Sequence, residues 1–331
     1  MQRSLNLNAK YFDEKGAPGD PLQILQDHGV NYIRLRVWVN PSHGYNNKAK
    51  VVEFASLIKA RGMRLLIDFH YSDTWADPQH QLKPAAWADL DFQQLQVRLY
   101  DHTYDICQSL GNAGSPPDMV QIGNEITPGM LLPEGGTVNW DKLAVLLKRG
   151  YSAVKACHPS TLVMLHIDRG GDNAAARTWF DHAAARGVKW DAIGLSYYSY
   201  WHGTPAAMAA NAADLKSRYG TPVVIVETAY PFTLLENDSE KNVIFSSDQL
   251  PPEYPATPSG QAANLRAVLD AARDAGTWGV FYWEPTWTAV KGNGWDPANP
   301  DSGDQWENQA LFDYTGKVLP AMQEFRSQAG V

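Results

Sequence analysis

Two kinds of hydrophobic pattern alternate along the whole chain of 331 residues. Helical periodicity predicts helices at 21–28, 48–61, 90–112, 140–157, 173–186, 205–219, 260–275 and 317–328. Short runs rich in Val, Ile, Leu and Met, typical of buried parallel strands, lie at 31–39, 63–70, 118–124, 161–167, 191–198, 222–228 and 279–284. The alternation predicts parallel βα units, and its near-eightfold repetition predicts an α/β fold of the (β/α)8 TIM-barrel type. We expect a single domain over residues 1–331.

Glycine follows several of the predicted helices. A helix commonly ends at a residue in the left-handed conformation, which glycine adopts without a steric penalty. The glycines expected in this role are Gly29, Gly62, Gly187, Gly220 and Gly276.

The predicted elements are uneven in number, because no clear strand precedes the helix at 21–28. Residues 1–20 are polar and carry a turn signal at 16–20, and residues 4–8 are only a weak strand candidate. An open barrel leaves two exposed strand edges, which is a liability. The first strand is therefore either weak within residues 1–12 or missing from this chain.

Two long connections, 230–259 and 286–316, follow the last two predicted strands. Both begin at the carboxyl end of a strand, which is the face where barrel active sites form. Loops of this length in a compact domain usually have a function. We expect both to border a site, and we interpret the acids Glu236, Asp238 and Glu240 as a solvated loop face.

The charge and hydropathy of the chain exclude some partners. A net charge of −8 and a pI near 5.6 argue against nucleic acid or an anionic membrane. The sequence contains no apolar run of about 18 residues, so we expect no membrane span. Residues 1–8 lack the apolar stretch of a secretory signal, so any signal has been removed or lies upstream.

Aromatic residues and cysteines leave alternatives open. The 12 Trp and 15 Tyr fit either sugar stacking or core packing. Cys107 and Cys157 lie within predicted helices, and two cysteines do not form a disulfide framework. We expect two free thiols, although a bridge between them stays an alternative.

Two glutamates end short apolar runs, Glu125 after 118–124 and Glu227 after 222–226. Desolvating a carboxylate at the end of a buried strand is costly, so such a residue usually has a use. Two of them facing each other across a barrel mouth suit the hydrolysis of a glycosidic bond. Retaining hydrolysis needs a protonated acid and an ionised nucleophile about 5–5.5 Å apart.

The expected environments of these carboxyl groups differ. We expect Arg36 to lie beside Glu227 and to hold it ionised, whereas desolvation and repulsion by Glu227 keep Glu125 protonated. Asn124, next to Glu125, is expected to hydrogen-bond a sugar hydroxyl near the reacting carbon.

Polar and aromatic residues gather at the carboxyl ends of the other predicted strands. The candidates for substrate binding are Arg36, His70, Asp73, Trp75, Asp77, Asn124, His166, Tyr198, Trp201, Trp283 and Trp287. We prefer Tyr198 to Tyr197, but the phase of that strand is open by one residue. His70 and His166 have core-histidine alternatives, and we interpret Glu284 as structural because it follows the inward-facing Trp283.

Several motifs together resemble one enzyme family. The segments 34–41, 68–78 with 83–87, 121–125, 194–203 and 283–285 are similar to those of the endo-β-1,4-galactanases of glycoside hydrolase family 53. The resemblance runs from about residue 10 to the end, and the segment 68–78 is its most specific part. It implies a retaining (β/α)8 barrel with Glu125 as acid/base and Glu227 as nucleophile. The chain departs from the family pattern at its start, where the first strand and a short acidic turn are missing or replaced.

The resemblance also implies the partners of the enzyme. The substrate would be the polysaccharide β-1,4-galactan of type I arabinogalactan and pectin, cleaved by a monomer that is secreted or periplasmic. Some relatives bind calcium in the last loops, and Asp296, Asp301 and Asp304 are candidate ligands. Their spacing matches no compact calcium loop, so we expect no cofactor and no required metal.

Three alternatives remain from the sequence. The incomplete amino terminus is compatible with a non-catalytic glycan-binding barrel. His70, His166 and Asp168 motivate a metal hydrolase on the same fold. A related barrel glycanase such as a β-mannanase is the third.

Overall fold

The computed structural model describes residues 1–328 and contains a sheet of six parallel strands in sequence order. The strands are β1 (Tyr32–Val37), β2 (Arg64–Phe69), β3 (Met119–Ile122), β4 (Leu162–Ile167), β5 (Ala192–Ser196) and β6 (Val223–Glu227). Each pairs with its neighbour in parallel register. All six match predicted strands.

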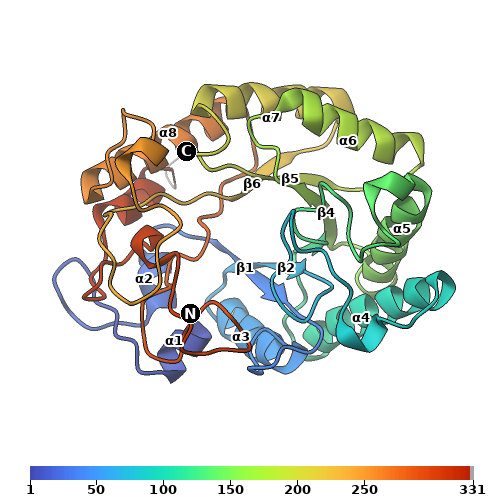
Figure 1. The fold of residues 1–331 in the computed structure, drawn as a ribbon, viewed down its shortest axis with the longest axis horizontal. Helices are drawn as coiled ribbons and strands as arrows, with labels where there is room; N and C mark the ends of the chain where they lie inside the picture. The colour runs from blue at the N-terminus through green and yellow to red at the C-terminus, as the bar shows by residue number, and fades with distance from the viewer. Residues whose placement is uncertain (329–331) are drawn as a thin grey trace.

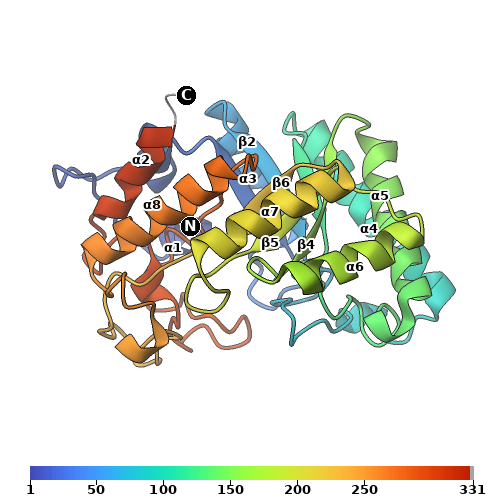
Figure 2. The ribbon, with the colours of Figure 1, turned by 90° about the horizontal axis from the view of Figure 1, so that it is seen from above.

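Helices surround the sheet, as the alternating pattern predicts (Figure 1). They are α1 (Gln2–Asn6), α2 (Pro21–Asp27), α3 (Lys48–Ala60), α4 (Phe92–Asn112), α5 (Trp140–Cys157), α6 (Asn173–Ala185), α7 (Pro205–Tyr219) and α8 (Pro258–Asp274). The 3₁₀ helices are η1 (Ala85–Trp87), η2 (Thr137–Asn139), η3 (Ser247–Gln249), η4 (Glu307–Gln309) and η5 (Pro320–Gln328). Figure 2 shows α6, α7 and α8 side by side, in agreement with their contacts. Among residues 1–328, no helix is long and apolar enough to cross a bilayer.

The boundaries of the helices follow local chemistry. The side chains that cap helix amino ends by accepting a backbone N–H are Asp20, Asn47, Asp91, Asn139, Asp172, Thr204 and Thr257. The five glycines predicted to end helices all have φ angles between 63° and 93°. They therefore occupy the left-handed region, as expected.

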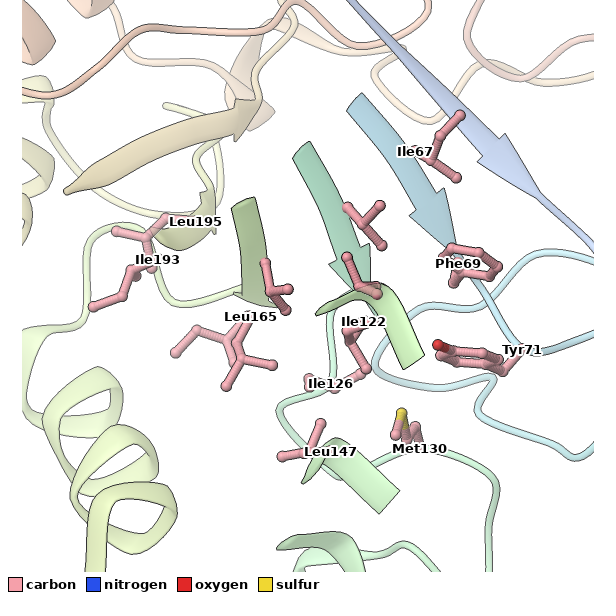
Figure 3. Close-up of a cluster of buried hydrophobic side chains, with 14 of the residues drawn as sticks. Ile67, Phe69, Tyr71, Ile122, Ile126, Met130, Leu147, Leu165, Ile193 and Leu195 are labelled. Carbon is pink, nitrogen blue, oxygen red and sulfur yellow. The ribbon is translucent and has the colours of Figure 1, made fainter. Parts of the chain in front are cut away.

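The main core lies between the outer face of the sheet and the helices. Alternate strand residues such as Ile67, Phe69 and Leu165 belong to this core, and so does Leu147 of α5 (Figure 3). Side chains of opposite phase form a smaller cluster inside the barrel. Its members are Leu66, Met119, Met164, Ala192, Val224 and Val226. The apolar layers on both faces explain why the strands read as nearly continuous hydrophobic runs.

The last predicted strand, 279–284, lies beside β6 but joins it through an isolated bridge. Phe281 N donates to Ile225 O at 2.7 Å, and Trp283 N donates to Thr228 O at 2.8 Å. The segment therefore occupies the place of the eighth strand of a barrel.

The first strand is missing from the described part of the chain. The weak candidate at residues 4–8 is wrong, because Gln2–Asn6 form helix α1. A space that we call the seam consequently separates β1 from 279–284. Residues of both segments line a cavity of about 1350 Å³ that continues to the carboxyl ends of the strands.

The two long loops contact each other, and the interpretation of their acids as a solvated face is wrong for Asp238 and Glu240, which accept from Asp304 N and Gln305 Nε2. The loops hydrogen-bond each other over the carboxyl ends, for example from Phe232 N to Asn308 O at 2.9 Å. Cys107 and Cys157 are free thiols, and burial raises the pKa of the Cys107 thiol.

Candidate active site

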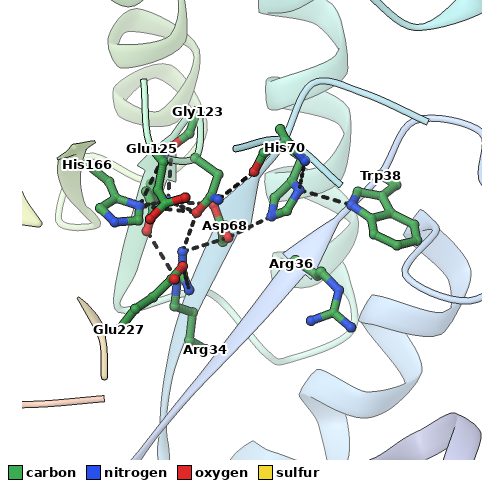
Figure 4. Close-up of polar contacts among 12 residues, drawn as sticks. Arg34, Arg36, Trp38, Asp68, His70, Gly123, Glu125, His166 and Glu227 are labelled. Carbon is green, nitrogen blue, oxygen red and sulfur yellow. Dashed lines mark hydrogen bonds and ion pairs between the residues drawn. The ribbon is translucent and has the colours of Figure 1, made fainter. Parts of the chain in front are cut away.

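Glu227 lies at the end of β6, and both oxygens of its carboxylate have a donor. Arg34 Nη1 donates to Oε1 at 2.8 Å (Figure 4). The Tyr198 hydroxyl donates to Oε2 at 2.9 Å. Burial and the nearby Glu227 charge raise the pKa of Tyr198, so it remains a donor. Tyr197 instead donates to Gly203 O at 2.6 Å. Of the two tyrosines, Tyr198 is the one that contacts Glu227.

Arg36 does not pair with Glu227, so that prediction is wrong. Arg36 forms an ion pair with Glu284 and lies 4.1 Å from the centre of the Trp75 ring. Side chains two residues apart share one face of a strand but differ in depth by about 6–7 Å. The pattern located the correct face, but Arg34, one step deeper, is the residue that reaches Glu227.

Asp68 on β2 balances the charge of Arg34 from the opposite side. It is 1% exposed and accepts from Arg34 Nη2 at 2.8 Å and from Gln121 Nε2 at 2.6 Å. Arg34 is therefore held between the carboxylates of Asp68 and Glu227. This arrangement fixes the guanidinium group at the base of the site.

His70 supports the same network. Its Nδ1 accepts from Trp38 Nε1 at 3.1 Å and from Ala76 N at 3.0 Å. A nitrogen that accepts two N–H groups carries no proton, so Nε2–H donates to Asp68 at 3.1 Å. Both ring nitrogens are thus engaged within the protein.

Glu125 follows β3 with a φ of 48°, an uncommon conformation for a residue other than glycine. Such backbone strain often accompanies functional positions. Its side chain keeps partial exposure to the cavity. Burial, followed by repulsion from Glu227, raises the pKa of Glu125 well above its ordinary value. The carboxyl oxygens of Glu125 and Glu227 approach within 4.8 Å.

His166 on β4 lies against the backbone of Glu125. Its Nδ1 accepts from Gln121 Nε2 at 2.9 Å and from Glu125 N at 3.3 Å, and its Nε2 contacts Ser196 Oγ at 2.8 Å. Burial lowers the pKa of His166 well below its usual range, so the ring is neutral. It positions the acid-bearing segment.

The side chain of Asn124 is also engaged. Its Nδ2 donates to Ala76 O at 2.7 Å, and its Oδ1 accepts from Arg34 Nη2 at 2.6 Å. The amide is therefore fixed in orientation beside the two glutamates. It lines the cavity, where a sugar hydroxyl would meet it.

Aromatic rings form a wall along the cavity. Trp75 and Trp287 stack with centroids 5.6 Å apart, and Trp283 meets Trp306 at 4.6 Å. Trp201, which is 52% exposed, extends this wall beyond Trp306 at 5.9 Å. Flat faces along a cleft with two carboxyl groups at its base suit a chain of sugar rings.

The profile of glycosyl hydrolase family 53 matches residues 1–325. The chain belongs to this family. An arabinogalactan endo-beta-1,4-galactanase from Cellvibrio japonicus is 38% identical over 331 residues, which are 96% of this chain and 86% of the relative. The solved family 53 catalytic domain of Ignisphaera aggregans has a TM-score of 0.93 at 39% identity, covering 98% of this chain and 92% of that one. A solved structure from work on two fungal beta-1,4-galactanases has a TM-score of 0.85 at 31% identity, covering 98% and 96%.

Membership of glycosyl hydrolase family 53 confirms three predictions made from the sequence. The resemblance to this family is confirmed. The predicted TIM-barrel fold of the chain is confirmed as well. The chain is a glycoside hydrolase.

Two of the candidate carboxylates fasten loops of this family 53 chain. Asp73 accepts from Asn40 N and Ala85 N, both at 2.9 Å, and is not among the residues that line the cavity. Asp77 borders the cavity but accepts from Gln79 N at 2.7 Å. Asp73 therefore shapes the loop after β2 rather than the sugar-facing surface.

The side chains at the centre of the site form hydrogen bonds within the protein, which bears on the alternative of a metal site. Among residues 1–328, one group of His, Cys, Asp or Glu side chains has its ligand atoms close enough together to bind a metal ion. It consists of Glu125, His166 and Glu227. Hydrogen-bond partners already occupy His166 and Glu227, as described above. Asp168 pairs with Thr127 and Arg169, so it does not join His70 and His166 as a ligand.

Three acidic residues of the last loop were the candidate calcium ligands. Asp296, Asp301 and Asp304 do not gather within ligand range in the described chain. Asp304 is 1% exposed, and its Oδ2 has no hydrogen-bond partner. Burial raises the pKa of Asp304 well above its ordinary value, and burial raises that of Glu307 to about 7.

Asp304→Asn is expected to stabilise the protein at pH 7 to 8 by about 1–3 kcal/mol, the usual cost of an unsatisfied buried group. Because its pKa is higher in the folded state, the carboxyl group destabilises folding increasingly as the pH rises above its unfolded value of 3.8. The gain should therefore shrink toward pH 4. Urea unfolding with a chelator present tests this, with the exposed Asp301→Asn as control. Equal stability of Asp304→Asn and the parent at pH 8 would contradict it.

Arg34→Met is expected to lower the free energy of unfolding by about 3–5 kcal/mol, because it leaves two buried carboxylates without their cation. Arg36→Met is the matched control, because Arg36 lies on the same strand and its ion pair with Glu284 is more exposed. Chemical denaturation at pH 7 measures both changes. A loss for Arg36→Met as large as that for Arg34→Met would contradict the assignment of these arginines.

Several site residues were not identified from the sequence. Arg34, Asp68 and Gln121 form the base of the site, and Trp306 belongs to its aromatic wall. A usable signal existed for the first three, because each is a polar residue in the middle of an apolar strand run. Trp306 gave no comparable signal, since it lies in a loop without periodicity.

Proposed function

We propose that this protein is an endo-β-1,4-galactanase that retains the anomeric configuration by double displacement. The proposal rests on the approach of the Glu125 and Glu227 carboxyl oxygens within 4.8 Å. Retaining enzymes hold their carboxyl groups about 5–5.5 Å apart, whereas inverting enzymes leave about 6.5–9.5 Å for a water molecule. The observed approach supports the shorter, retaining arrangement.

In the first step, Glu227 attacks the anomeric carbon while Glu125 donates its proton to the leaving oxygen. Arg34 and Tyr198 donate hydrogen bonds to the Glu227 carboxylate and orient it for attack. Because its pKa is raised, the Glu125 carboxyl group carries the proton that it donates at neutral pH. In the second step, ionised Glu125 takes a proton from the water that releases the sugar from Glu227.

The substrate assignment comes from the family 53 relatives, whose printed names include arabinogalactan endo-beta-1,4-galactanase. An open cleft with an aromatic wall accommodates a polymer at internal positions, as endo cleavage requires. In the proposed site, sugars contact Asn124, Trp75, Trp283, Trp287 and Trp201, while His70 and His166 act by positioning.

The remaining parts of the proposal concern context. We propose a monomeric, single-domain enzyme over residues 1–331 that meets its polymeric substrate outside the cytoplasm. We propose further that hydrolysis needs no cofactor and no metal. Activity that persists after dialysis against a chelator supports this point, and activity restored only by a divalent cation overturns it.

Product analysis on β-1,4-galactan tests the function. Proton NMR during the first minutes is expected to show β-configured oligosaccharides that mutarotate later. Initial α products would overturn the two-step mechanism. Faster cleavage of β-mannan than of galactan would overturn the substrate, and binding without release of reducing ends would make the protein a glycan-binding barrel.

A further inference from the structure

Ser196, at the end of β5, is buried beside the side chain of Glu125, the proposed acid/base. Its exposed fraction is 0%, and it is not among the residues that line the cavity. A sugar in the cleft therefore cannot reach the Ser196 hydroxyl. Any contribution of Ser196 to the reaction passes through the side chains around it.

The pairing of β5 with β6 brings Ser196 level with Glu227. Leu195 pairs with Ile225, but the next residue, Ser196, pairs with Glu227, so the register skips Val226. Val226 belongs to the cluster inside the barrel, and strict alternation would turn the residue after it outward to the helices. The register shift instead re-aims that residue, as β-bulges beside active sites do. Ser196 therefore lies at the depth of the site in the neighbouring strand.

His166 fixes the direction of the hydrogen bonds at Ser196. Its Nδ1 accepts from the backbone N–H of Glu125 at 3.3 Å and from Gln121 Nε2 at 2.9 Å. The other tautomer would turn an Nδ1 proton toward Asn124 Oδ1 at 3.1 Å, but a backbone N–H can only donate. Because the ring is neutral, its one proton is on Nε2 and is donated to Ser196 Oγ at 2.8 Å.

The Ser196 hydroxyl then needs an acceptor for its own proton. Its oxygen already accepts from His166, and a buried hydroxyl that lacks an acceptor is costly. Burial raises the pKa of Glu125, whereas its side-chain hydrogen bond with Ser196 acts in the lowering direction. A bond that favours the charged form of a carboxyl group is one in which the partner donates. The donors therefore run from His166 through Ser196 to Glu125.

The other groups around Glu125 do not support its charged form. The titratable groups that the structure places near it are Glu227, Asp168, Asp77, Tyr198 and His166. Burial, followed by the charges of these three carboxylates, raises the pKa of Glu125. The tyrosine and the histidine are uncharged. The Ser196 hydroxyl thus opposes the effect of its surroundings when Glu125 is ionised.

We propose that Ser196 is a positioning residue for the acid/base, with its hydroxyl donating to one oxygen of the Glu125 carboxyl group. This inference rests on the proposed function, because it assumes that Glu125 exchanges a proton with the substrate. In the first step, the contact leaves the protonated oxygen of Glu125 free to face the glycosidic oxygen. In the second step, it stabilises the carboxylate that takes a proton from water.

Ser196→Ala is expected to raise the midpoint of the Glu125 titration, followed by carbon-13 NMR without substrate, by about one pH unit. Loss of one hydrogen bond to a charged group accounts for a shift of that size. Ser196→Thr keeps a hydroxyl and should return the midpoint toward that of the parent. The control is Ser199→Ala, which removes another buried hydroxyl, one that accepts from Asn264 Nδ2 at 2.7 Å. An unchanged midpoint in Ser196→Ala, or an equal shift in Ser199→Ala, refutes the inference.

Kinetics on two substrates separate positioning from general damage to the site. We expect Ser196→Ala to lower kcat/KM on galactan roughly tenfold and to move its alkaline limb to higher pH. Glycosyl–enzyme formation on an aryl galactoside with a dinitrophenolate leaving group should change much less, because that group leaves without protonation. Equal losses on both substrates with an unmoved limb would make the role of Ser196 purely structural and refute the inference.

The position of the His166 proton can be measured on the unmodified protein. Nitrogen-15 NMR of labelled histidine is expected to show the proton on Nε2. A proton on Nδ1 would make Ser196 donate to His166 instead of Glu125, which refutes the inference even if the variants fail to fold. Failure of the parent to cleave galactan would refute the proposed function and the role of Ser196 together. Failure of the titration or of the tautomer alone leaves the proposed function standing.

Discussion

Glu227→Gln is expected to lower kcat on β-1,4-galactan by on the order of 10⁴-fold or more, because an amide cannot form the glycosyl ester. The fold should persist, since the amide oxygen still accepts from Arg34 or Tyr198. Reducing-end release measures the loss, and circular dichroism verifies folding. Glu284→Gln is the matched control, since it also removes an arginine-paired carboxylate at the rim of the barrel.

The same variant has an effect on its neighbour. Burial and the charge of Glu227 both raise the pKa of Glu125, so removal of that charge should lower it. Carbon-13 NMR titration of the Glu125 carboxyl group follows this shift. Retention of substantial activity by Glu227→Gln, or an unchanged Glu125 titration, would contradict the roles given to the pair.

Glu125→Gln is expected to lower kcat on galactan by about 10²–10⁴-fold, the usual contribution of general acid–base catalysis. Formation of the glycosyl–enzyme on an aryl galactoside with a dinitrophenolate leaving group should be affected much less, because that group leaves without protonation. A burst of dinitrophenol in rapid-mixing experiments measures this step. Equal losses on both substrates would remove Glu125 from the role of proton donor.

The protonation state that Glu125 needs determines the direction in which activity changes with pH. Glu125 must be protonated for the first step, so activity on galactan should fall as the pH rises through its raised pKa. The alkaline limb of kcat/KM should then disappear in Glu125→Gln. A limb at unchanged pH in the variant would assign it to another group.

The sequence predicted the framework because its signals are local. Apolar runs bounded by capping residues and glycines specify each βα unit without knowledge of the others. Glu125 and Glu227 were identifiable for the same reason, because an acid at the end of a buried run is unusual whatever lies opposite. The choice between Tyr197 and Tyr198 stayed open, because it depends on a strand phase that alternates with a period of two.

The errors concern distances across the barrel. The choice between Arg34 and Arg36 depends on the stagger of β1 relative to β6, and no local pattern encodes that stagger. The network of Asp68 and Gln121 likewise joins residues from three strands. Residues 4–8 were a weak strand candidate because five residues carry little periodicity, and tertiary contacts decide their conformation.

The Arg36 guanidinium joins two parts of the molecule that otherwise have separate roles. It pairs with Glu284 across the seam and lies against the Trp75 ring of the aromatic wall. A change in the width of the seam would therefore displace a ring of that wall. The position of β1 relative to 279–284 and the shape of the aromatic wall are therefore mechanically linked through one side chain.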